Sequence, residues 1–211
     1  MEWNPSKPAR NVILVGAIIS FVAILLQFYL ILAHRTTTVL STIIRFFSFF
    51  TILTNILVAL CFGYLLSGPS SRWGKFFANN INIAAIAVNI TIVGLTYNII
   101  LRGIWQPKGL DRLADELLHS VIPIYFVAFW IFFVPKSGFS WKSVLPWLIY
   151  PAVYAIYILA RGAIIGHYPY PFIDVVKLGY PQVLLNCLIL TFSFLVVSLV
   201  FVSIAKSMDK K

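Results

Sequence analysis

The chain alternates between long apolar runs and short polar segments. Six of the runs contain about twenty residues or more, which is the length that crosses the roughly 30 Å hydrocarbon core of a bilayer. A backbone in that environment must satisfy its own hydrogen bonds, so we expect each run to be a helix. The predicted spans are residues 11–33, 40–66, 80–101, 115–134, 145–165 and 182–205.

Gly- and Pro-containing segments separate the runs, as in "SGPSSRWGK" at 67–75 and "GIWQPKGLDR" at 103–112. Such residues end helices and begin turns. Residues 11–33 follow Lys7 and Arg10 as in a signal peptide, but the run is too long and lacks a clear cleavage site. The sequence therefore predicts an all-α polytopic membrane protein with one six-helix domain over residues 1–211.

Composition supports this class, because 61% of the residues are hydrophobic and only 10% are charged. The net charge of +10 comes from Lys and Arg scattered between the runs, so we expect no nucleic-acid partner. The charges favour cytoplasmic termini by the positive-inside rule. The terminal side would hold Lys7, Arg10, Arg72, Lys75, Lys136, Lys142, Lys206, Lys210 and Lys211, and the other side Arg35, Arg102, Lys108, Arg112 and Lys177.

Polar residues recur on one face of the second predicted helix. At 100° per residue, Ser48, Thr51 and Asn55 fall within about 60° of one another. Thr54 lies on the flank of this stripe, and Arg45 begins it. With Arg45 at the outer interface, Thr51 would lie about 9 Å deeper in a continuous helix. Polar groups at such depth usually face a bundle interior or a cavity.

The fourth predicted helix carries Arg112, Asp115 and His119 on one face. Asp115 is four residues before His119, close enough to bias the imidazole electrostatically. Pro123 has no N–H to give to the His119 carbonyl, so we expect a kink there. These features are typical of a cavity wall, although a histidine within a membrane is more often a packing residue.

The remaining chemistry points to acyl transfer. No G-x-S-x-G, phosphate loop or Cys–His pair is present, which leaves the helix-two hydroxyls as nucleophiles and His119 as their base. Asn55 or Asn89 could hold an oxyanion. For Asn89 the alternative is an ordinary interhelical hydrogen bond.

We expect neither a metal nor a cofactor, because the three histidines form no ligand motif. The residues Asp111, Asp115, His119 and Asp174 leave a metal-dependent enzyme open as a weaker alternative.

Several motifs resemble a known family. "FFTILTN" on a second helix, "LLHSVIP" on a fourth and six spans in 211 residues resemble the androgen-induced-gene family, also known for the androgen-dependent TFPI-regulating protein. "WLIYPAVYAIYILARG" followed by "YPYPFIDV" is similar to its bacterial six-pass relatives, and the resemblance covers essentially the whole chain.

The resemblance implies an intramembrane threonine hydrolase that cleaves fatty acid esters of hydroxy fatty acids. By motif, the nucleophile falls on Thr51 and the histidine on His119, with Thr54 as the alternative nucleophile. The chain departs from the vertebrate pattern at "TILTN" and in its fifth loop.

The fifth loop offers two further candidates. Arg161 could pair with Asp174 across the loop, or it could grip a substrate carboxylate. The prolines of "YPYP" disfavour helix and predict an extended lid or plug. Tyr168 and Tyr170 lie near predicted span ends, where aromatic rings favour the headgroup region.

The leading hypothesis is a metal-independent, threonine-type hydrolase of lipid esters. Thr51 would be the nucleophile and His119 the base, supported by Ser48, Asn55, Asn89 and Asp115. Its substrate would come from the bilayer, and the chain would lie in a bacterial inner membrane. The alternative is a non-enzymatic lipid-binding, transport or scaffold protein. The sequence leaves the oligomeric state open.

Overall fold

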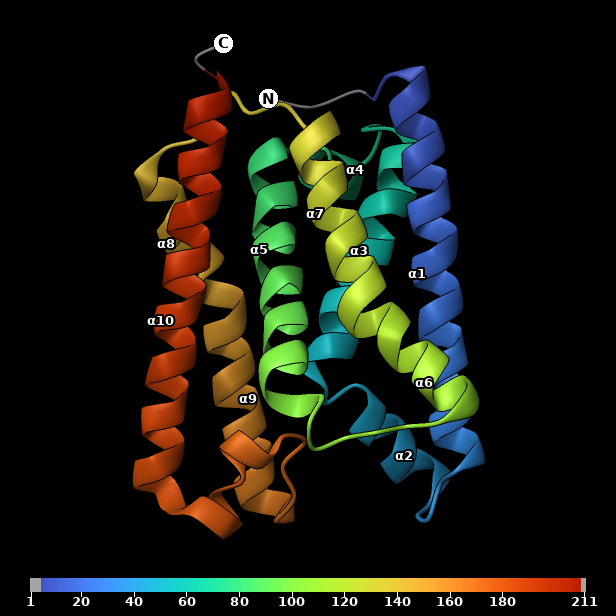
Figure 1. The fold of residues 1–211 in the computed structure, drawn as a ribbon, viewed down its shortest axis with the longest axis vertical. Coiled ribbons are helices and arrows are strands. Elements are labelled where there is room, and N and C mark those ends of the chain that lie inside the picture. Colours follow the sequence, from blue (N-terminus) through green and yellow to red (C-terminus); the bar gives the residue numbers. More distant parts are fainter. Residues whose placement is uncertain (1–4, 210–211) are drawn as a thin grey trace.

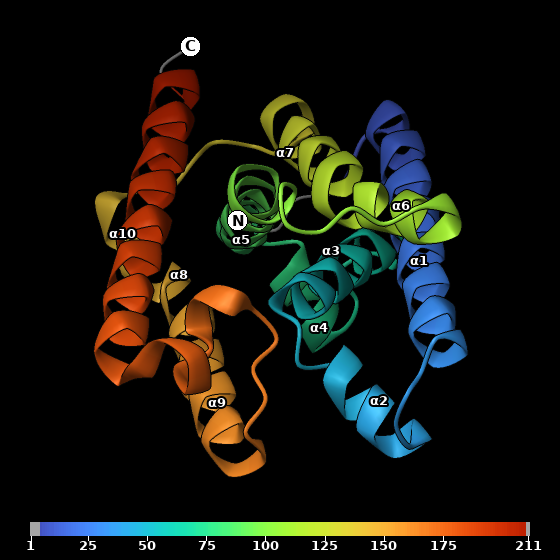
Figure 2. The same ribbon diagram turned by 60° about the horizontal axis from the view of Figure 1, so that its bottom comes forward.

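A computed structural model describes residues 5–209 as a bundle of helices without a strand in that range (Figures 1 and 2). Six stretches are long and apolar enough to cross a membrane, as predicted. The spans are Lys7–Ala33, Phe50–Ser67, Asn80–Leu101, Gly109–Phe133, Trp141–Ile165 and Val175–Asp209. The first described residues of the bundle and the last lie at the same end, the top of Figure 1.

Helix α5 (Asn80–Thr96) is the centre of the bundle. It contacts α3 (Phe50–Ser67), α7 (Ile122–Phe133) and α10 (Val175–Asp209), and α1 (Lys7–Ala33) packs along α3. Between α3 and α7, the ring of Phe62 meets those of Phe126 and Phe129 at centroid distances of 5.2 and 5.1 Å. Such edge-on aromatic contacts fix how the central helices pack.

The fifth span is built from three pieces. They are the 3-10 turn η3 (Trp141–Ser143), α8 (Val144–Trp147) and α9 (Ile149–Ile165). Large apolar side chains on the outer helices remain exposed, as expected for surfaces that meet lipid. Examples are Phe132, Ile156 and Leu188.

The second predicted span, residues 40–66, is two helices rather than one. Helix α2 (Val39–Phe46) ends before an extended Phe49, and α3 begins at Phe50. The Ser48 hydroxyl donates to the Ile44 carbonyl at 2.6 Å, and the Tyr154 hydroxyl donates to the Ser48 carbonyl at 2.9 Å. In a continuous helix, backbone N–H groups would donate to the carbonyls of Ile44 and Ser48. Here the side-chain hydroxyls of Ser48 and Tyr154 donate to them instead.

This break corrects two sequence expectations. Arg45 lies on α2, so the depth estimated along a continuous helix does not apply to Thr51. Ser48 lies in the linker between the two helices, so it does not share one helix face with Thr51 and Asn55 as predicted. Thr51 is instead the second residue of α3, where the first N–H groups of a helix have no helical acceptor.

The last predicted span, residues 182–205, is longer in the structure. Val175–Asp209 is one element with a kink at Gly179, whose φ of 74° and ψ of 160° are non-helical. Gly adopts such a positive φ without steric cost, and Pro181 follows in the next turn. The kink turns the first residues of α10 back towards the loop that follows α9.

The link between α9 and α10 is anchored at several points. It contains the 3-10 turn η4 (Pro171–Ile173) and an extended Tyr170. The Asn186 amide donates to the Phe172 carbonyl at 2.7 Å, and the Asp174 carboxylate accepts from the N–H groups of Val176 and Lys177. The extended conformation predicted for "YPYP" is thus found at Tyr170, whereas Pro171 begins a 3-10 turn.

Candidate functional site

Two π-helical turns face each other at the end of the bundle opposite the termini. Helix α5 continues into η1 (Tyr97–Leu101), and η2 (Leu117–Val121) joins α6 (Gly109–Glu116) to α7. The second turn carries His119 and precedes Pro123, the residue that predicted a kink. Single π turns within helices occur frequently at functional sites.

The His119 carbonyl is held by the neighbouring helix, because Pro123 has no N–H to donate. The Asn98 amide donates to this carbonyl at 3.3 Å and to the Gly94 carbonyl at 2.8 Å. Gly94 allows the approach, since a Cβ there would lie 3.1 Å from Pro123 Cβ and 3.3 Å from the His119 carbonyl oxygen. The sequence thus places η2 directly against α5.

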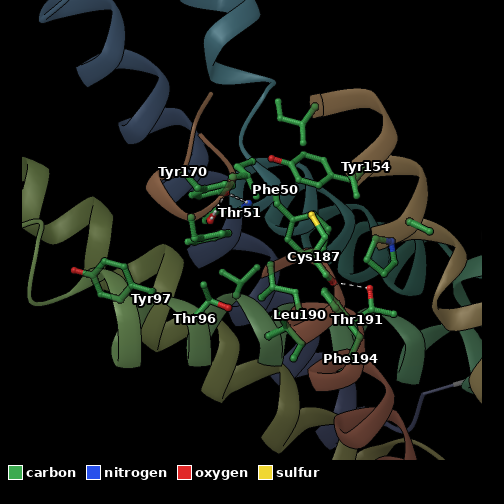
Figure 3. A pocket seen from close by; sticks show the side chains of 18 of the residues that line it. Phe50, Thr51, Thr96, Tyr97, Tyr154, Tyr170, Cys187, Leu190, Thr191 and Phe194 are labelled. Atoms are coloured by element: carbon green, nitrogen blue, oxygen red, sulfur yellow. Dashed lines mark hydrogen bonds between the residues drawn. The ribbon is translucent and has the colours of Figure 1, made fainter. Parts of the chain in front are cut away.

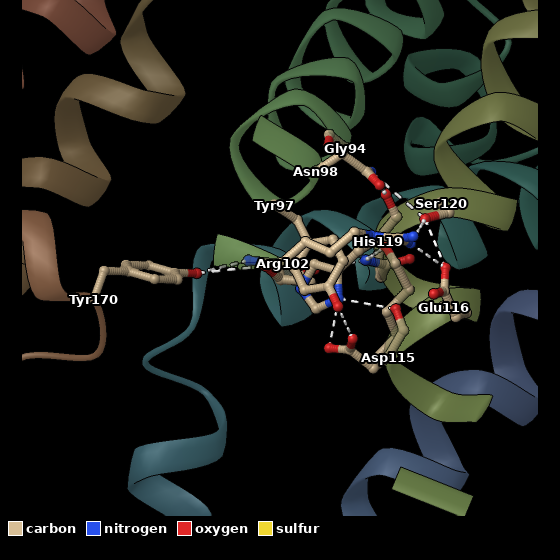
Figure 4. Close-up of polar contacts among 12 residues, drawn as sticks. Gly94, Tyr97, Asn98, Arg102, Asp115, Glu116, His119, Ser120 and Tyr170 are labelled. Carbon is tan, nitrogen blue, oxygen red and sulfur yellow. Dashed lines mark hydrogen bonds and ion pairs between the residues drawn. The ribbon is translucent and has the colours of Figure 1, made fainter. Parts of the chain in front are cut away.

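The His119 imidazole is fixed by Asp115 and Tyr97 (Figure 4). Its Nδ1 lies 3.1 Å from Asp115 Oδ1 and 2.9 Å from the Asp115 carbonyl oxygen. Its ring stacks on that of Tyr97 with centroids 4.2 Å apart and an interplanar angle of 17°. The Tyr97 hydroxyl donates to Asp115 Oδ2, so one carboxylate holds both rings.

These contacts assign the proton on the ring. Both partners of Nδ1 are acceptors, so Nδ1 carries a hydrogen. No residue within 5–209 forms a hydrogen bond with Nε2. In the neutral ring with its hydrogen on Nδ1, Nε2 has the free lone pair that a general base needs.

Next to this cluster, Arg102 forms a separate ion pair. Its guanidinium lies 2.5 Å from Glu116 Oε2 and donates to the Ser120 hydroxyl at 3.2 Å. The guanidinium also lies 5.5 Å from the centre of the Tyr97 ring. The pair is half-exposed and braces η1 against η2.

Thr51 contacts the loop after α9. Its N–H donates to the Tyr170 hydroxyl at 3.3 Å, and its Oγ1 lies 3.4 Å from the same oxygen (Figure 3). Burial raises the pKa of Tyr170 above its ordinary value, so the phenol stays protonated at neutral pH. The Tyr170 hydroxyl points inward to the first turn of α3.

Two cavities meet at these side chains. The first has a volume of about 170 Å³ and the second about 110 Å³. Thr51, His119 and Tyr170 line both. Thr51 and His119, far apart in the sequence, are therefore brought to one place. The hydrogen bonds of the described chain join Thr51 to Tyr170 and none joins it to His119.

Thr54, the alternative nucleophile, is placed elsewhere. It is fully buried, its hydroxyl lies 3.3 Å from that of Tyr150, and it lines neither cavity. The structure therefore favours Thr51 over Thr54 as the residue accessible to a ligand beside His119.

The two asparagines do not reach the cavities. Asn55 donates to the carbonyls of Thr51 at 2.8 Å and Leu118 at 3.2 Å, which uses both amide hydrogens. Asn89 donates to the Ala85 carbonyl at 2.7 Å. Neither lines either cavity, so the expected oxyanion role is not supported for them. Asn55 instead ties α3 to η2, and thereby Thr51 to the turn that carries His119.

Arg161 and Asp174 do not pair in the described chain, contrary to the expectation from sequence. Arg161 donates to the His167 carbonyl at 3.5 Å, and Asp174 lies 3.5 Å from Lys177 Nζ. Asp174 is used to cap the first turn of α10, which draws its carboxylate away. Arg161 lines neither cavity, so a grip on a substrate carboxylate has no support either.

Within residues 5–209, no group of three or more His, Cys, Asp or Glu side chains could hold a metal ion. Asp111, Asp115, His119 and Asp174 therefore do not converge on one point. The residues that sequence reasoning missed are Tyr97 and Tyr170. Tyr97 gave no signal beyond its place in an apolar run, whereas the rigid "YPYP" segment could have drawn attention to Tyr170.

No family model matches the chain, and neither a curated protein nor a solved structure matches it.

Proposed function

We propose that the protein is an intramembrane hydrolase of lipid esters, with Thr51 as nucleophile and His119 as general base. The observation that carries this proposal is that both residues line the same two cavities while His119 keeps Nε2 free as an acceptor. A threonine hydroxyl becomes a useful nucleophile only when a base takes its proton.

In the proposed reaction, Thr51 and His119 act together in two steps. Thr51 Oγ1 attacks the ester carbonyl as His119 Nε2 takes its proton, and the alkoxide then leaves with that proton. Water, activated by the same nitrogen, hydrolyses the acyl-threonine. Asp115 keeps the ring oriented and stabilises the imidazolium, the role that a buried carboxylate has in other triads.

The Tyr170 hydroxyl lies 3.4 Å from Thr51 Oγ1, and either oxygen can be the donor of this contact. We assign the Tyr170 hydroxyl the stabilisation of the oxyanion, in place of the two asparagines. In this role the phenol would donate its proton to the carbonyl oxygen as that oxygen gains charge. The N–H of Thr51, at the start of α3, donates to the Tyr170 hydroxyl at 3.3 Å and so holds the phenol oxygen beside Thr51.

The surroundings suit a substrate that stays in the bilayer. The larger cavity is lined mostly by apolar side chains such as Ile92, Leu148 and Phe194. With cytoplasmic termini, the site would lie in the outer half of the membrane. The fatty acid esters of hydroxy fatty acids implied by the family resemblance are one such class of ester.

A fluorophosphonate probe tests the proposal, because it reacts with activated hydroxyls without needing an alcohol group. We expect labelling of the purified protein on the peptide that contains Thr51. Labelling should be lost in Thr51→Ala and His119→Gln but retained in Thr51→Ser. Thr54→Ala is the matched control and should label like the wild type. An unlabelled wild type, or labelling that persists in the Thr51→Ala/Thr54→Ala double variant, would overturn the proposal.

A second candidate is a lipid-binding protein without turnover. It is favoured by one observation, the hydrogen-bond contact of Thr51 Oγ1 with Tyr170 rather than with His119. In that case, lipid esters extracted from the purified protein would be intact and present in stoichiometric amount. Incubation would leave them unchanged, and Thr51→Val would lower thermal stability only.

A further inference from the structure

The two cavities share Thr51, His119 and Tyr170 but differ in the polarity of the other side chains that line them. We propose that they bind the two halves of one ester: an acyl chain in the larger cavity and an uncharged, hydroxyl-bearing alcohol such as glycerol in the smaller. This inference rests on the hydrolase proposed above and names its substrate class, an acylglycerol-type neutral lipid.

The larger cavity fits the acyl half. Apart from the shared residues, its polar side chains are few and mostly partnered among themselves or with backbone, such as Thr191 with the Cys187 carbonyl at 2.8 Å. Aliphatic and aromatic side chains from α5, α9 and α10 form most of the wall. Such a wall offers an alkyl chain from the bilayer surroundings as apolar as the hydrocarbon that it leaves.

The smaller cavity presents hydrogen-bonding groups instead. Gln27, from the membrane-spanning part of α1, lines it together with Trp105, Asp111 and Asp115. The Gln27 amide forms no hydrogen bond with any residue in the described part of the chain. An amide without a protein partner leaves its N–H groups and its oxygen for a ligand, and a hydroxyl can both donate to and accept from it.

The charges around this cavity select against an anionic alcohol. Its charged wall residues are Asp111 and Asp115, besides the ring of His119. Asp115 is already engaged by Tyr97 and His119, and Asp111 has only a 3.5 Å contact with the exposed His34. A substrate carboxylate here would lie beside like charges, whereas a hydroxyl could donate to Asp111.

The proposal therefore differs from the hydroxy fatty acid esters that the family resemblance implies, whose alcohol half carries a carboxylate. The cavity that would receive this half has no Lys or Arg in its wall. Arg161, the sequence candidate for binding such a group, lines neither cavity.

Three oleoyl esters of similar size separate these alternatives. They are the esters of glycerol, propan-1-ol and 3-hydroxypropanoate, assayed with the purified protein in detergent. We expect kcat/KM to be highest for the glycerol ester, about 10-fold above the propyl ester, and lowest for the carboxylate-bearing ester.

Two substitutions test whether Gln27 and Asp111 cause the preference among the three esters. Gln27→Leu should lower the ratio of kcat/KM for the glycerol ester over the propyl ester to about 1. Asp111→Asn should raise kcat/KM for the carboxylate-bearing ester relative to the glycerol ester by about 3-fold or more. Ser20→Ala is the matched control: it removes a buried, unpartnered hydroxyl from the same helix, outside both cavities, and should leave both ratios unchanged.

Ether analogues give a binding measurement that needs no turnover. The glycerol ether of oleyl alcohol should raise the thermal midpoint of the wild type more than oleyl propyl ether does, and Gln27→Leu should remove the difference. Equal shifts for both ethers in the wild type, or equal changes in Gln27→Leu and Ser20→Ala, would overturn the inference.

If the fluorophosphonate labels Thr51 while the three esters are cleaved equally, the hydrolase stands and this inference fails. If labelling fails, the ether series alone decides whether the smaller cavity recognises hydroxyl groups.

Discussion

The imidazole of His119 lies flat against the phenol ring of Tyr97, with ring centroids 4.2 Å apart. The two rings come from the two π turns, η2 and η1, and the Asp115 carboxylate contacts both. The histidine is therefore held from one face and from one edge, which leaves Nε2 as its free position.

We expect Asp115→Asn to reduce kcat by about 100-fold or more, because an amide at this position can favour the wrong tautomer of His119. The KM should change little, since Asp115 contacts His119 rather than the acyl chain. Steady-state kinetics with a lipid ester measures both constants. Glu116→Gln is the control: its carboxylate pairs with Arg102 at 2.5 Å outside both cavities, and comparable loss of kcat there would contradict the assignment.

Tyr97→Phe should have a smaller effect. The ring stack on His119 is retained, and only the hydrogen bond to Asp115 is lost, so we expect kcat to fall by about 3- to 10-fold. Tyr125→Phe loses a comparable hydrogen bond, from its hydroxyl to the Val12 carbonyl at 2.7 Å, but lies outside the cavities. It should reduce the thermal midpoint without reducing kcat. Equal kcat values for the two variants would argue against a role for the Tyr97 hydroxyl.

Tyr170→Phe tests the oxyanion assignment. The variant keeps the ring, which stacks on Phe172 at a centroid distance of 5.2 Å, and removes the hydroxyl beside Thr51. Loss of one oxyanion donor typically costs 10²–10³ in kcat. We expect a fall of about 100-fold in kcat at nearly constant KM. A wild-type kcat in this variant would show that another group holds the oxyanion.

Gly94→Ala should displace the turn that carries His119. The added methyl group would lie 3.1 Å from Pro123 Cβ and 3.3 Å from the His119 carbonyl oxygen, tighter than normal contacts. We expect a loss of about 1–3 kcal/mol in the free energy of unfolding, together with reduced labelling of Thr51. Gly63→Ala, where the methyl group meets nothing within 4 Å, is the matched helical control and should not destabilise the protein.

The opposite end of the bundle predicts a pH dependence of stability. Lys136 Nζ donates to the Trp130 and Ile131 carbonyls at 2.7 and 3.1 Å, and burial lowers the pKa of Lys136 to about 8. Between about pH 8 and its ordinary pKa of 10.5, the unfolded chain binds more protons than the folded one, so stability should rise with pH. Thermal midpoints across this range should show a rise that is absent in Lys136→Met. A falling midpoint in the wild type relative to the variant would contradict the sign.

The six spans could be predicted from the sequence because apolar length alone determines which segments cross a bilayer. The break between α2 and α3 could not. It depends on the Tyr154 hydroxyl, which comes from α9 to take the Ser48 carbonyl. An apolar run that contains Phe46 to Phe50 carries no local signal for such a contact, since neither Gly nor Pro is present.

The candidate site also combines features that the sequence predicts with features that it does not. Asp115 and His119 are four residues apart on one helix, so their contact follows from local geometry. The inward position of Tyr170 and the loss of the Arg161–Asp174 pair depend on how the link after α9 packs. The Tyr170–Thr51 contact joins residues 119 positions apart, which periodicity does not encode, whereas the contacts that separate Arg161 from Asp174 are local to this link.

The early end of the second membrane helix also has a consequence for substrate selection. With 18 residues, α3 is about 27 Å long, slightly shorter than an average hydrocarbon core. With α3 centred in the hydrocarbon core, Thr51 in its first turn would lie at the boundary between hydrocarbon and headgroups, the depth at which membrane lipids carry their ester linkages. Bilayer thickness would then determine which bond of a lipid comes level with Thr51, and a thicker or thinner membrane would misalign the bond even for a correct substrate.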